Sequence, residues 1–152
     1  MATQTRTLIL LKPDAVQRGL IGTLISRIEQ RGLKIAGLKL MQIDQALARR
    51  HYAAHVEKPF YPGLEKFITS GPVVALAVQG VNAVEVMRQL MGATDPSKAG
   101  TGTVRGDFGL SIGMNLMHGS DSAEAAEKEL ALYFKPGEIL DWHRTSDRWV
   151  IE

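Results

Sequence analysis

Residues 73–78 read Val-Val-Ala-Leu-Ala-Val, a run of six apolar side chains that follows Gly71-Pro72. A short continuous apolar run next to turn residues indicates a buried strand. A similar run, Thr7-Leu8-Ile9-Leu10-Leu11, predicts a second strand that is covered on both faces or is short and central. It ends at Lys12-Pro13. Because the residue before a proline is pushed to extended geometry, we expect Lys12 at the C-terminal end of that strand.

Between these runs the pattern changes from helical to alternating. Apolar side chains recur at helical spacing from Ile21 to Ile28, and Gly32 is placed to end that helix. Residues 33–43 then alternate as a strand does. The alternation slips in phase at Gly37, which predicts a β-bulge there.

Four further helices are predicted from a capping residue or an apolar face. The first is capped by Asp44, carries Leu47, His51 and Ala54 on one face, and ends at Lys58-Pro59. The second spans Leu64, Phe67 and Ile68, and the third opens with an Asn82–Glu85 capping box and ends at Gly92. The last carries Ala126, Leu130 and Tyr133.

Two segments lack a repeat. Residues 92–111 hold five Gly and one Pro, and a stretch of this length within a compact domain is usually functional or disordered. Residues 136–152 are rich in aromatic side chains, including Trp142 and Trp149, and have no assignable pattern. Between residues 92–111 and the last helix, apolar side chains alternate over residues 112–117, and this alternation predicts the last core strand.

The order of elements predicts the fold class. Four strands and two crossover helices favour an α+β protein, a ferredoxin-like sandwich with a four-stranded antiparallel sheet and helices packed on one face. The length of 152 residues is that of one domain, so we expect residues 1–152 to form a single unit.

Composition excludes several classes of site. The chain has no Cys, which removes disulfides, thiolate zinc sites, iron–sulfur ligation and a Cys nucleophile. The net charge of +2 permits an anionic ligand, but no run of basic residues exceeds Arg49-Arg50, so a nucleic-acid partner is not indicated. No apolar stretch approaches about 18 residues and no signal-peptide pattern is present, so we expect a cytoplasmic protein without a membrane span.

His118 is the first candidate for chemistry. It is followed by Gly119 and is expected between the last strand and the N-terminus of the last helix. The helix dipole there favours an anion and a neutral imidazole, which suits a nucleophile that accepts a phosphate. The alternative is a histidine that only hydrogen-bonds a turn, and local sequence context by itself favours that alternative.

Three cations could serve the same chemistry. Lys12, Arg88 and Arg105 lie on three different predicted segments, and phosphoryl transfer needs positive donors around the developing charge. Each of them taken singly is more typical of solvated surface. The Walker phosphate loop, the protein-kinase glycine loop and the RNP1 motif are all absent, so a nucleotide site would need another design.

Other candidates are weaker. His51 and His55 have i, i+4 spacing, but the segment His-Tyr-Ala-Ala-His lacks the HExxH form and has no evident third ligand, so a metal pair is disfavoured. Phe60 and Tyr61 could close a pocket or stack on a base, although core packing is the commoner role.

Several separated segments resemble the nucleoside diphosphate kinases. They are residues 115–122 (NLMHGSDS), 7–22 (TLILLKPDAVQRGLIG), 51–60 (HYAAHVEKPF), 69–74 (TSGPVV), 92–96 (GATDP) and 102–108 (GTVRGDF). They keep the family's order and nearly its spacing, and the resemblance covers essentially the whole chain. Met114 and Thr101 depart from residues common in the family, at positions that are not catalytic.

The resemblance implies a fold, a reaction and a site. The fold is ferredoxin-like, and the γ-phosphate of a nucleoside triphosphate passes to a nucleoside diphosphate by a ping-pong route. Mg²⁺ would be held by the nucleotide phosphates, without an assigned direct protein ligand. His118 would be phosphorylated on the ring nitrogen nearer the backbone, and Glu129 would hold its ring. The remaining implied residues are Lys12, Tyr52, Arg88, Thr94, Arg105 and Asn115 for the phosphates and sugar, and Phe60, Leu64 and Ile112 for the base.

The resemblance also implies an oligomeric state, and the residues weigh against two alternative functions. The tail through Trp149 resembles that of the longer, hexameric members, so we expect a homohexamer with three-fold contacts involving Gly92 to Phe108. A catalytically silent family member would be expected to lack His118, Lys12 or Arg105, and none is missing. A nucleic-acid-binding domain of this fold would need sheet-surface aromatics, and aromatic residues are only 6%.

Overall fold

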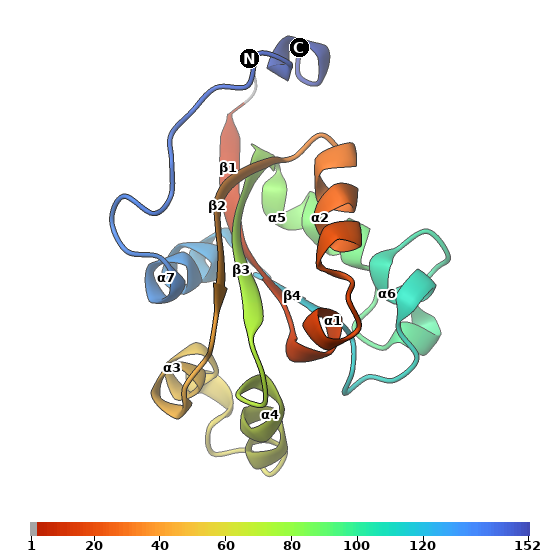
Figure 1. Ribbon diagram of the computed structural model, residues 1–152, viewed down its shortest axis with the longest axis vertical. Coiled ribbons are helices and arrows are strands. Elements are labelled where there is room, and N and C mark those ends of the chain that lie inside the picture. The colour runs from red at the N-terminus through yellow and green to blue at the C-terminus, as the bar shows by residue number, and fades with distance from the viewer. Residues whose placement is uncertain (1–2) are drawn as a thin grey trace.

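The computed structural model describes residues 3–152, which form an antiparallel four-stranded sheet in the order β2-β3-β1-β4 (Figure 1). The strands are β1 (Gln4–Leu11), β2 (Lys34–Met41), β3 (Val73–Val81) and β4 (Met117–Gly119). The two apolar runs of the sequence are therefore the central strands β1 and β3, which pair from Gln4↔Val81 to Leu11↔Val74. The strand order is that of the predicted ferredoxin-like α+β sandwich.

Helices cover both faces of the sheet, so the expectation of helices on one face is wrong. On one face, α2 (Ile21–Gln30) and α5 (Ala83–Met91) pack against Ile9 and Leu11 of β1. Residues of α3 (Gln45–His51), α4 (Tyr61–Ile68) and α7 (Ala123–Tyr133) join the core on the opposite face, with Leu8 and Leu10. The central strands are apolar on both faces, and each face needs a cover.

The glycine-rich stretch is ordered by short helices. It contains η2 (Pro96–Lys98) and α6 (Val104–Phe108), each capped by a side chain at its first turn. A further short helix that the sequence pattern missed, α1 (Pro13–Gln17), follows β1 directly. Helices of five residues or fewer are too short to show a helical period, which is why the segment looked irregular.

The predicted bulge is confirmed in β2. Ile35 pairs with Val78 and Gly37 with Ala77, so Ala36 is the extra residue between them. Gly37 faces the ring of Phe134, which would lie 3.1 Å from a Cβ at this position.

The helix that Asp44 begins is shorter than expected. The Asp44 carboxylate accepts a hydrogen bond from the Leu47 amide at 2.8 Å, which confirms the cap. The helix nevertheless ends at His51 instead of continuing to Lys58-Pro59, and a 3₁₀ turn, η1 (Ala53–His55), follows. His51 and His55 therefore do not share one helix.

The predicted capping box at Asn82 is wrong. Asn82 adopts a left-handed conformation with φ 54°, and its side chain makes no capping hydrogen bond. The hydroxyl of Thr5 on β1 accepts from the Ala83 amide at 3.1 Å instead. A tertiary contact thus replaces the local cap.

The last strand is shorter and later than predicted. Ile112 and Met114 are 60% and 51% exposed, and residues 111–114 form a turn closed by an isolated bridge. The strand β4 begins only at Met117, directly after Leu116, whose φ is 75°. His118 is consequently in the middle of a strand, paired with Leu10 of β1, and not at the junction with α7.

The tail runs back along β2, as Figure 1 shows. The Leu140 amide donates to the Ala36 carbonyl at 2.8 Å and the Trp142 indole to the Ile35 carbonyl at 3.2 Å, before a last 3₁₀ turn, η3 (Asp147–Trp149). Within residues 3–152, no helix has the length and apolar character needed to cross a bilayer.

Candidate active site

A cavity of about 390 Å³ opens where β1 ends and β4 begins, beside α3, α5 and α7. Eight of the sequence-predicted site residues line it: Lys12, Tyr52, Arg88, Thr94, Arg105, Asn115, His118 and Glu129. They come from six separate parts of the chain. The fold therefore brings together the cations and the histidine that the sequence could only place on separate elements.

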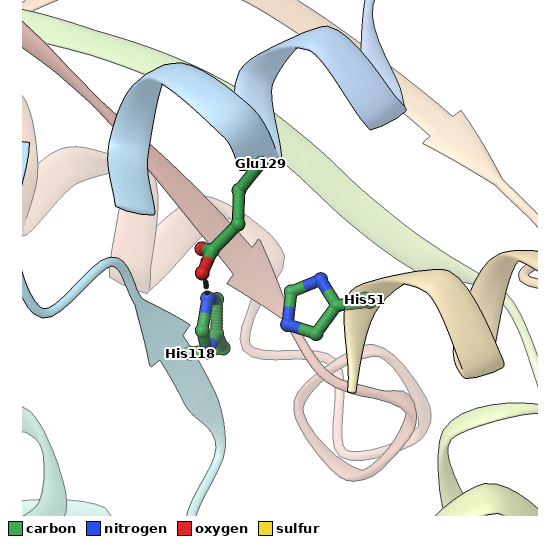
Figure 2. A group of neighbouring side chains, drawn as sticks. All are labelled: His51, His118 and Glu129. Atoms are coloured by element: carbon green, nitrogen blue, oxygen red, sulfur yellow. Dashed lines mark hydrogen bonds and ion pairs between the residues drawn. The ribbon is translucent and has the colours of Figure 1, made fainter. Parts of the chain in front are cut away.

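The ring of His118 is fixed by a carboxylate (Figure 2). Its Nε2 lies 2.7 Å from Oε1 of Glu129, and the Ser120 hydroxyl donates to the same oxygen at 2.9 Å. Burial acts to raise the pKa of Glu129. The hydrogen bond from His118 and the favourable charge interaction with the His118 ring outweigh burial, so the pKa of Glu129 is lowered. An ionised carboxylate only accepts, so we assign the proton of neutral His118 to Nε2 and the lone pair to Nδ1.

The carboxylate is itself fixed by the core. Glu129 lies on α7, which packs on β1 through Leu130. Ser120, which is fully buried, accepts a hydrogen bond from the Leu8 amide of β1 at 3.3 Å. The orientation of the His118 ring is thus determined by secondary structure on both sides.

Lys12 is held in a chain of polar contacts. Its Nζ donates to Oδ1 of Asn115 at 2.9 Å, and the Asn115 amide donates to the Thr94 carbonyl at 3.0 Å. Burial, followed by the nearby Arg105 charge, lowers the pKa of Lys12 to about 8. The end of β1, the loop after α5 and the segment before β4 meet in this contact.

Arg105 is bound to the backbone on three sides. Its guanidinium donates to the carbonyls of Gly92 at 3.1 Å, Asn115 at 3.1 Å and Met117 at 2.6 Å, and the residue is only 7% exposed. Burial, and then the Arg88 charge, lowers its pKa to about 10. Arg105 still carries a full charge at neutral pH, and it lines the cavity together with Arg88.

The comparisons with known proteins agree with this site. Residues 5–139 match the family model described as nucleoside diphosphate kinase. The chain belongs to the nucleoside diphosphate kinase family. It is therefore a phosphotransferase that acts on nucleotides.

Curated and solved members are similar over nearly their full length. The nucleoside diphosphate kinase of Roseiflexus castenholzii is 60% identical over 147 residues, covering 97% of this chain and 99% of the relative. A halophilic nucleoside diphosphate kinase from Halobacterium salinarum, solved in complex with CDP, is 51% identical with a TM-score of 0.96, covering 99% of this chain and all of that one. A nucleoside diphosphate kinase family protein from Babesia bovis is 41% identical with a TM-score of 0.94, and the match covers 97% of this chain and 99% of that one.

Three residues expected at the base lie outside the cavity lining of this nucleoside diphosphate kinase family member. Phe60 is 56% exposed at the start of α4, and its ring is 5.6 Å from that of His55, which does line the cavity. Leu64 lies on α4, and Ile112 is 60% exposed in the turn before β4. Phe60 and Ile112 are thus exposed to solvent, and Leu64 is half-buried.

Sequence reasoning weighed His51 only as a metal partner of His55 and missed its contact with His118 in the cavity. The ring of His51 lies 4.6 Å from that of His118 in an edge-to-face arrangement, and it also contacts Tyr52 and Tyr133. Its Nδ1 is buried and has no hydrogen-bond partner among residues 3–152. Burial, followed by the charges of His118, lowers the pKa of His51 to about 3, so it stays neutral. Nothing in the spacing from residue 51 to residue 118 could have revealed this contact.

Proposed function

We propose that His118 is the phosphate carrier of the transfer reaction. Its Nδ1 attacks the γ-phosphorus of a nucleoside triphosphate, an N–P bond forms, and the bond from that phosphorus to the β–γ bridging oxygen breaks. The nucleoside diphosphate leaves with that oxygen. In the second half-reaction the terminal oxygen of another nucleoside diphosphate takes the phosphoryl group and frees Nδ1.

One observation carries this proposal. Glu129 engages Nε2 of His118 at 2.7 Å, and this leaves the lone pair of a neutral ring on Nδ1. During attack the ring becomes cationic, and the adjacent carboxylate stabilises that charge through the Nε2 proton. Glu129 acts as a positioning residue, and Ser120 keeps its carboxylate in place.

The surrounding donors hold the phosphates and sugar. Lys12, Arg88 and Arg105 supply positive charge, while Thr94, Asn115 and Tyr52 supply polar groups. Burial raises the pKa of Tyr52 to about 12, so its phenol remains a hydrogen-bond donor throughout the working range. Fixed cations of this kind stabilise the charge on the transferring phosphoryl oxygens.

We assign the base to the solvent side of the cavity, where Phe60 and Ile112 would offer exposed apolar surface, together with the half-buried Leu64 of α4. Aromatic stacking does not depend on base identity. The Halobacterium salinarum relative was solved with CDP, which supports the same nucleotide class for this chain.

We propose Mg²⁺ as the ion that accompanies the nucleotide. Mg²⁺ takes oxygen ligands and is usually held by substrate phosphates plus one or two carboxylates. Of the two carboxylates lining the cavity, Glu129 is engaged by His118 and Ser120, which leaves Asp121 on the lining. The residues fit an ion held mainly by the phosphates, which it would neutralise and orient.

The remaining proposals concern the whole chain. We propose that residues 1–152 form one domain, that it acts in the cytoplasm, and that it assembles as a homohexamer whose partners are nucleoside di- and triphosphates, without nucleic acid as its main partner. The family match over residues 5–139 and the four-stranded sheet support the single domain, and the family match also supports the nucleotide partners.

The carrier role is tested by incubating the protein with ATP and Mg²⁺ and measuring its intact mass. A gain of one phosphate that mild acid removes is expected for the parent and for His143→Ala, which alters an exposed histidine in the tail. His118→Ala should gain none and should lose several orders of magnitude in turnover. Its circular dichroism should be unchanged, with a stability loss within about 1–2 kcal/mol. Parent-like turnover by folded His118→Ala would overturn the covalent route.

A further inference from the structure

Three metal-ligating side chains meet on one wall of the cavity. His51 comes from α3, His118 from β4 and Glu129 from α7, and the three converge in Figure 2. Each offers one ligand atom, and these atoms all lie within 4.8 Å of one another. Residues 3–152 contain one group of this kind. The transfer reaction as derived above uses His118 and Glu129 but assigns nothing to His51.

We propose that His51, His118 and Glu129 form a binding site for a transition-metal dication of the Zn²⁺ type. Two imidazole nitrogens and one carboxylate oxygen are a common ligand set for zinc sites that keep a fourth position open. The fourth position here would face the cavity and be left to water or a phosphate oxygen.

The distances are compatible with side-chain adjustment alone. Zinc–nitrogen and zinc–oxygen bonds of about 2.0–2.2 Å place tetrahedral ligand atoms roughly 3.4 Å apart. The His118–Glu129 contact of 2.7 Å would have to open by about 0.7 Å, and His51 would have to move inward by no more than about 1.4 Å. His51 loses no hydrogen bond at Nδ1 in doing so, because that atom has no partner in the described part of the chain.

This site differs in chemistry from the one that Mg²⁺ uses. Magnesium prefers oxygen ligands and is bound through phosphates, whereas imidazole suits zinc, cobalt, nickel and copper. Lys12, Arg88 and Arg105 line the same cavity and repel any dication, so the affinity should be below that of a structural zinc site. The expected role is therefore reversible occupation by a metal in excess, not a permanent structural centre.

Metal binding and phosphorylation should exclude each other, an inference that rests on the proposed carrier role of His118. A neutral imidazole has a single ring-nitrogen lone pair. If the metal takes Nε2, the proton moves from Nε2 to Nδ1, and Nδ1 can no longer attack phosphorus. If Nδ1 already carries a phosphoryl group, Nε2 keeps its proton toward Glu129 and offers the metal nothing. The metal would thus act as an inhibitor that competes with phosphate transfer at one ring.

The binding step is tested on the nucleotide-free protein with Co²⁺ as a spectroscopic probe. One equivalent should produce the intense visible bands of a tetrahedral site, and Zn²⁺ should remove them by displacement. His51→Asn should weaken Co²⁺ binding by more than about 10–100-fold, which is the loss expected for a residue that only hydrogen-bonds to a metal ligand. His143→Asn, an exposed histidine outside the cavity, should bind as the parent does. Glu129→Gln provides a second ligand variant if His51→Asn does not fold.

The exclusion step is tested on the phosphoenzyme freed of nucleotide. Phosphorylated protein should show the Co²⁺ bands only as the phosphate is lost, and Zn²⁺ added first should slow phosphoenzyme formation in the parent but not in His51→Asn. Absence of tetrahedral bands, or equal binding by His51→Asn and the parent, overturns the metal site. If the bands appear but no phosphohistidine ever forms, the metal site stands and the carrier role of His118 fails.

Discussion

Arg105 joins three segments through one side chain. Its guanidinium donates hydrogen bonds to the carbonyls of Gly92, Asn115 and Met117. The group therefore holds these segments together and also supplies a positive charge. A lysine offers a single ammonium and cannot reproduce a planar fork of donors. The position therefore tests how far phosphate binding and local folding depend on the same group.

We expect Arg105→Lys to lower the free energy of unfolding by about 2–4 kcal/mol, because at least two buried carbonyls lose their charged donor. Turnover should fall with it, since β4 carries His118. Urea unfolding followed by circular dichroism measures the first effect. Arg50→Lys, an exposed arginine on α3, is the matched control and should change stability by less than about 0.5 kcal/mol. Equal stabilities of the two variants would contradict the cross-linking role.

Lys12 should give the reaction an alkaline limit. Burial first, and the Arg105 charge second, lower its pKa to about 8, so its ammonium is present below that pH and is lost as the pH rises through it. Phosphate binding needs the charged form. The kcat/KM of the free enzyme for a nucleoside triphosphate should therefore fall above about pH 8. Lys12→Gln should have a lower kcat/KM, and its kcat/KM should not fall above about pH 8. If kcat/KM of that variant still falls there, the titration belongs to another group.

Phe60 predicts broad tolerance of the base. It offers a half-exposed aromatic face on which any base could stack. Diphosphates of adenine, guanine, cytosine and uracil should react with kcat/KM values within about a hundredfold of one another. Phe60→Ala should weaken all four similarly. Steady-state kinetics that show a preference of several thousandfold would mean that hydrogen bonds read the base.

At the level of elements, α6 depends on a glycine outside it. Gly92 ends α5 with φ 85°, and a Cβ there would lie 2.5 Å from the Thr103 hydroxyl. That hydroxyl caps α6 by accepting from the Gly106 amide at 3.0 Å. The end of one helix and the start of the next thus occupy the same small space.

Gly92→Ala should destabilise the protein by about 1–3 kcal/mol from backbone strain alone, with the displaced cap adding to it. Gly63→Ala lies in α4 with open space around its Cβ position and should instead stabilise by about 0.5–1 kcal/mol. Thermal unfolding of the two variants gives opposite shifts in Tm. A Tm of Gly92→Ala equal to that of the parent would show that the loop relaxes freely.

The same elements show how far sequence reasoning reaches. Long apolar runs identified β1 and β3, and Asp44 and the slip at Gly37 identified a cap and a bulge, because each is a local effect of a few neighbouring residues. The strand at residues 112–117 was misplaced because a turn can alternate as a strand does.

Tertiary contacts set the rest. The cap of α5 comes from Thr5, far away along the chain, and so could not be found in the segment around Asn82. Residue patterns alone named His118 and three cations, and the family resemblance supplied Glu129 and the other cavity residues. Neither supplied the approach of His51 to His118, which only the packing of α3 beside β4 creates.

For the whole molecule, exposed apolar surface supports assembly. Leu38 and Leu40 on β2 are 55% and 65% exposed, and Leu110 in the segment before β4 is 94% exposed. Surfaces of this kind are typical of contacts between subunits. We expect a hexamer with three-fold contacts that involve Gly92 to Phe108. Light scattering should therefore give six times the mass of one chain. A monomer or dimer mass at working concentration would reject the hexamer.

The central place of β1 in the sheet has a consequence for how the protein is made. A ribosome releases β1 first, but its two neighbours, β3 and β4, follow only after residues 81 and 119 have emerged. A nascent chain therefore exposes a long apolar strand with unpaired amides on both sides, a template for unwanted pairing with other chains. The His118–Glu129 contact needs α7 as well, so a chain halted before that helix holds Lys12, Arg88 and Arg105 but has no oriented histidine. Under the proposed carrier role of His118, translation must pass residue 129 before the first phosphate can be accepted.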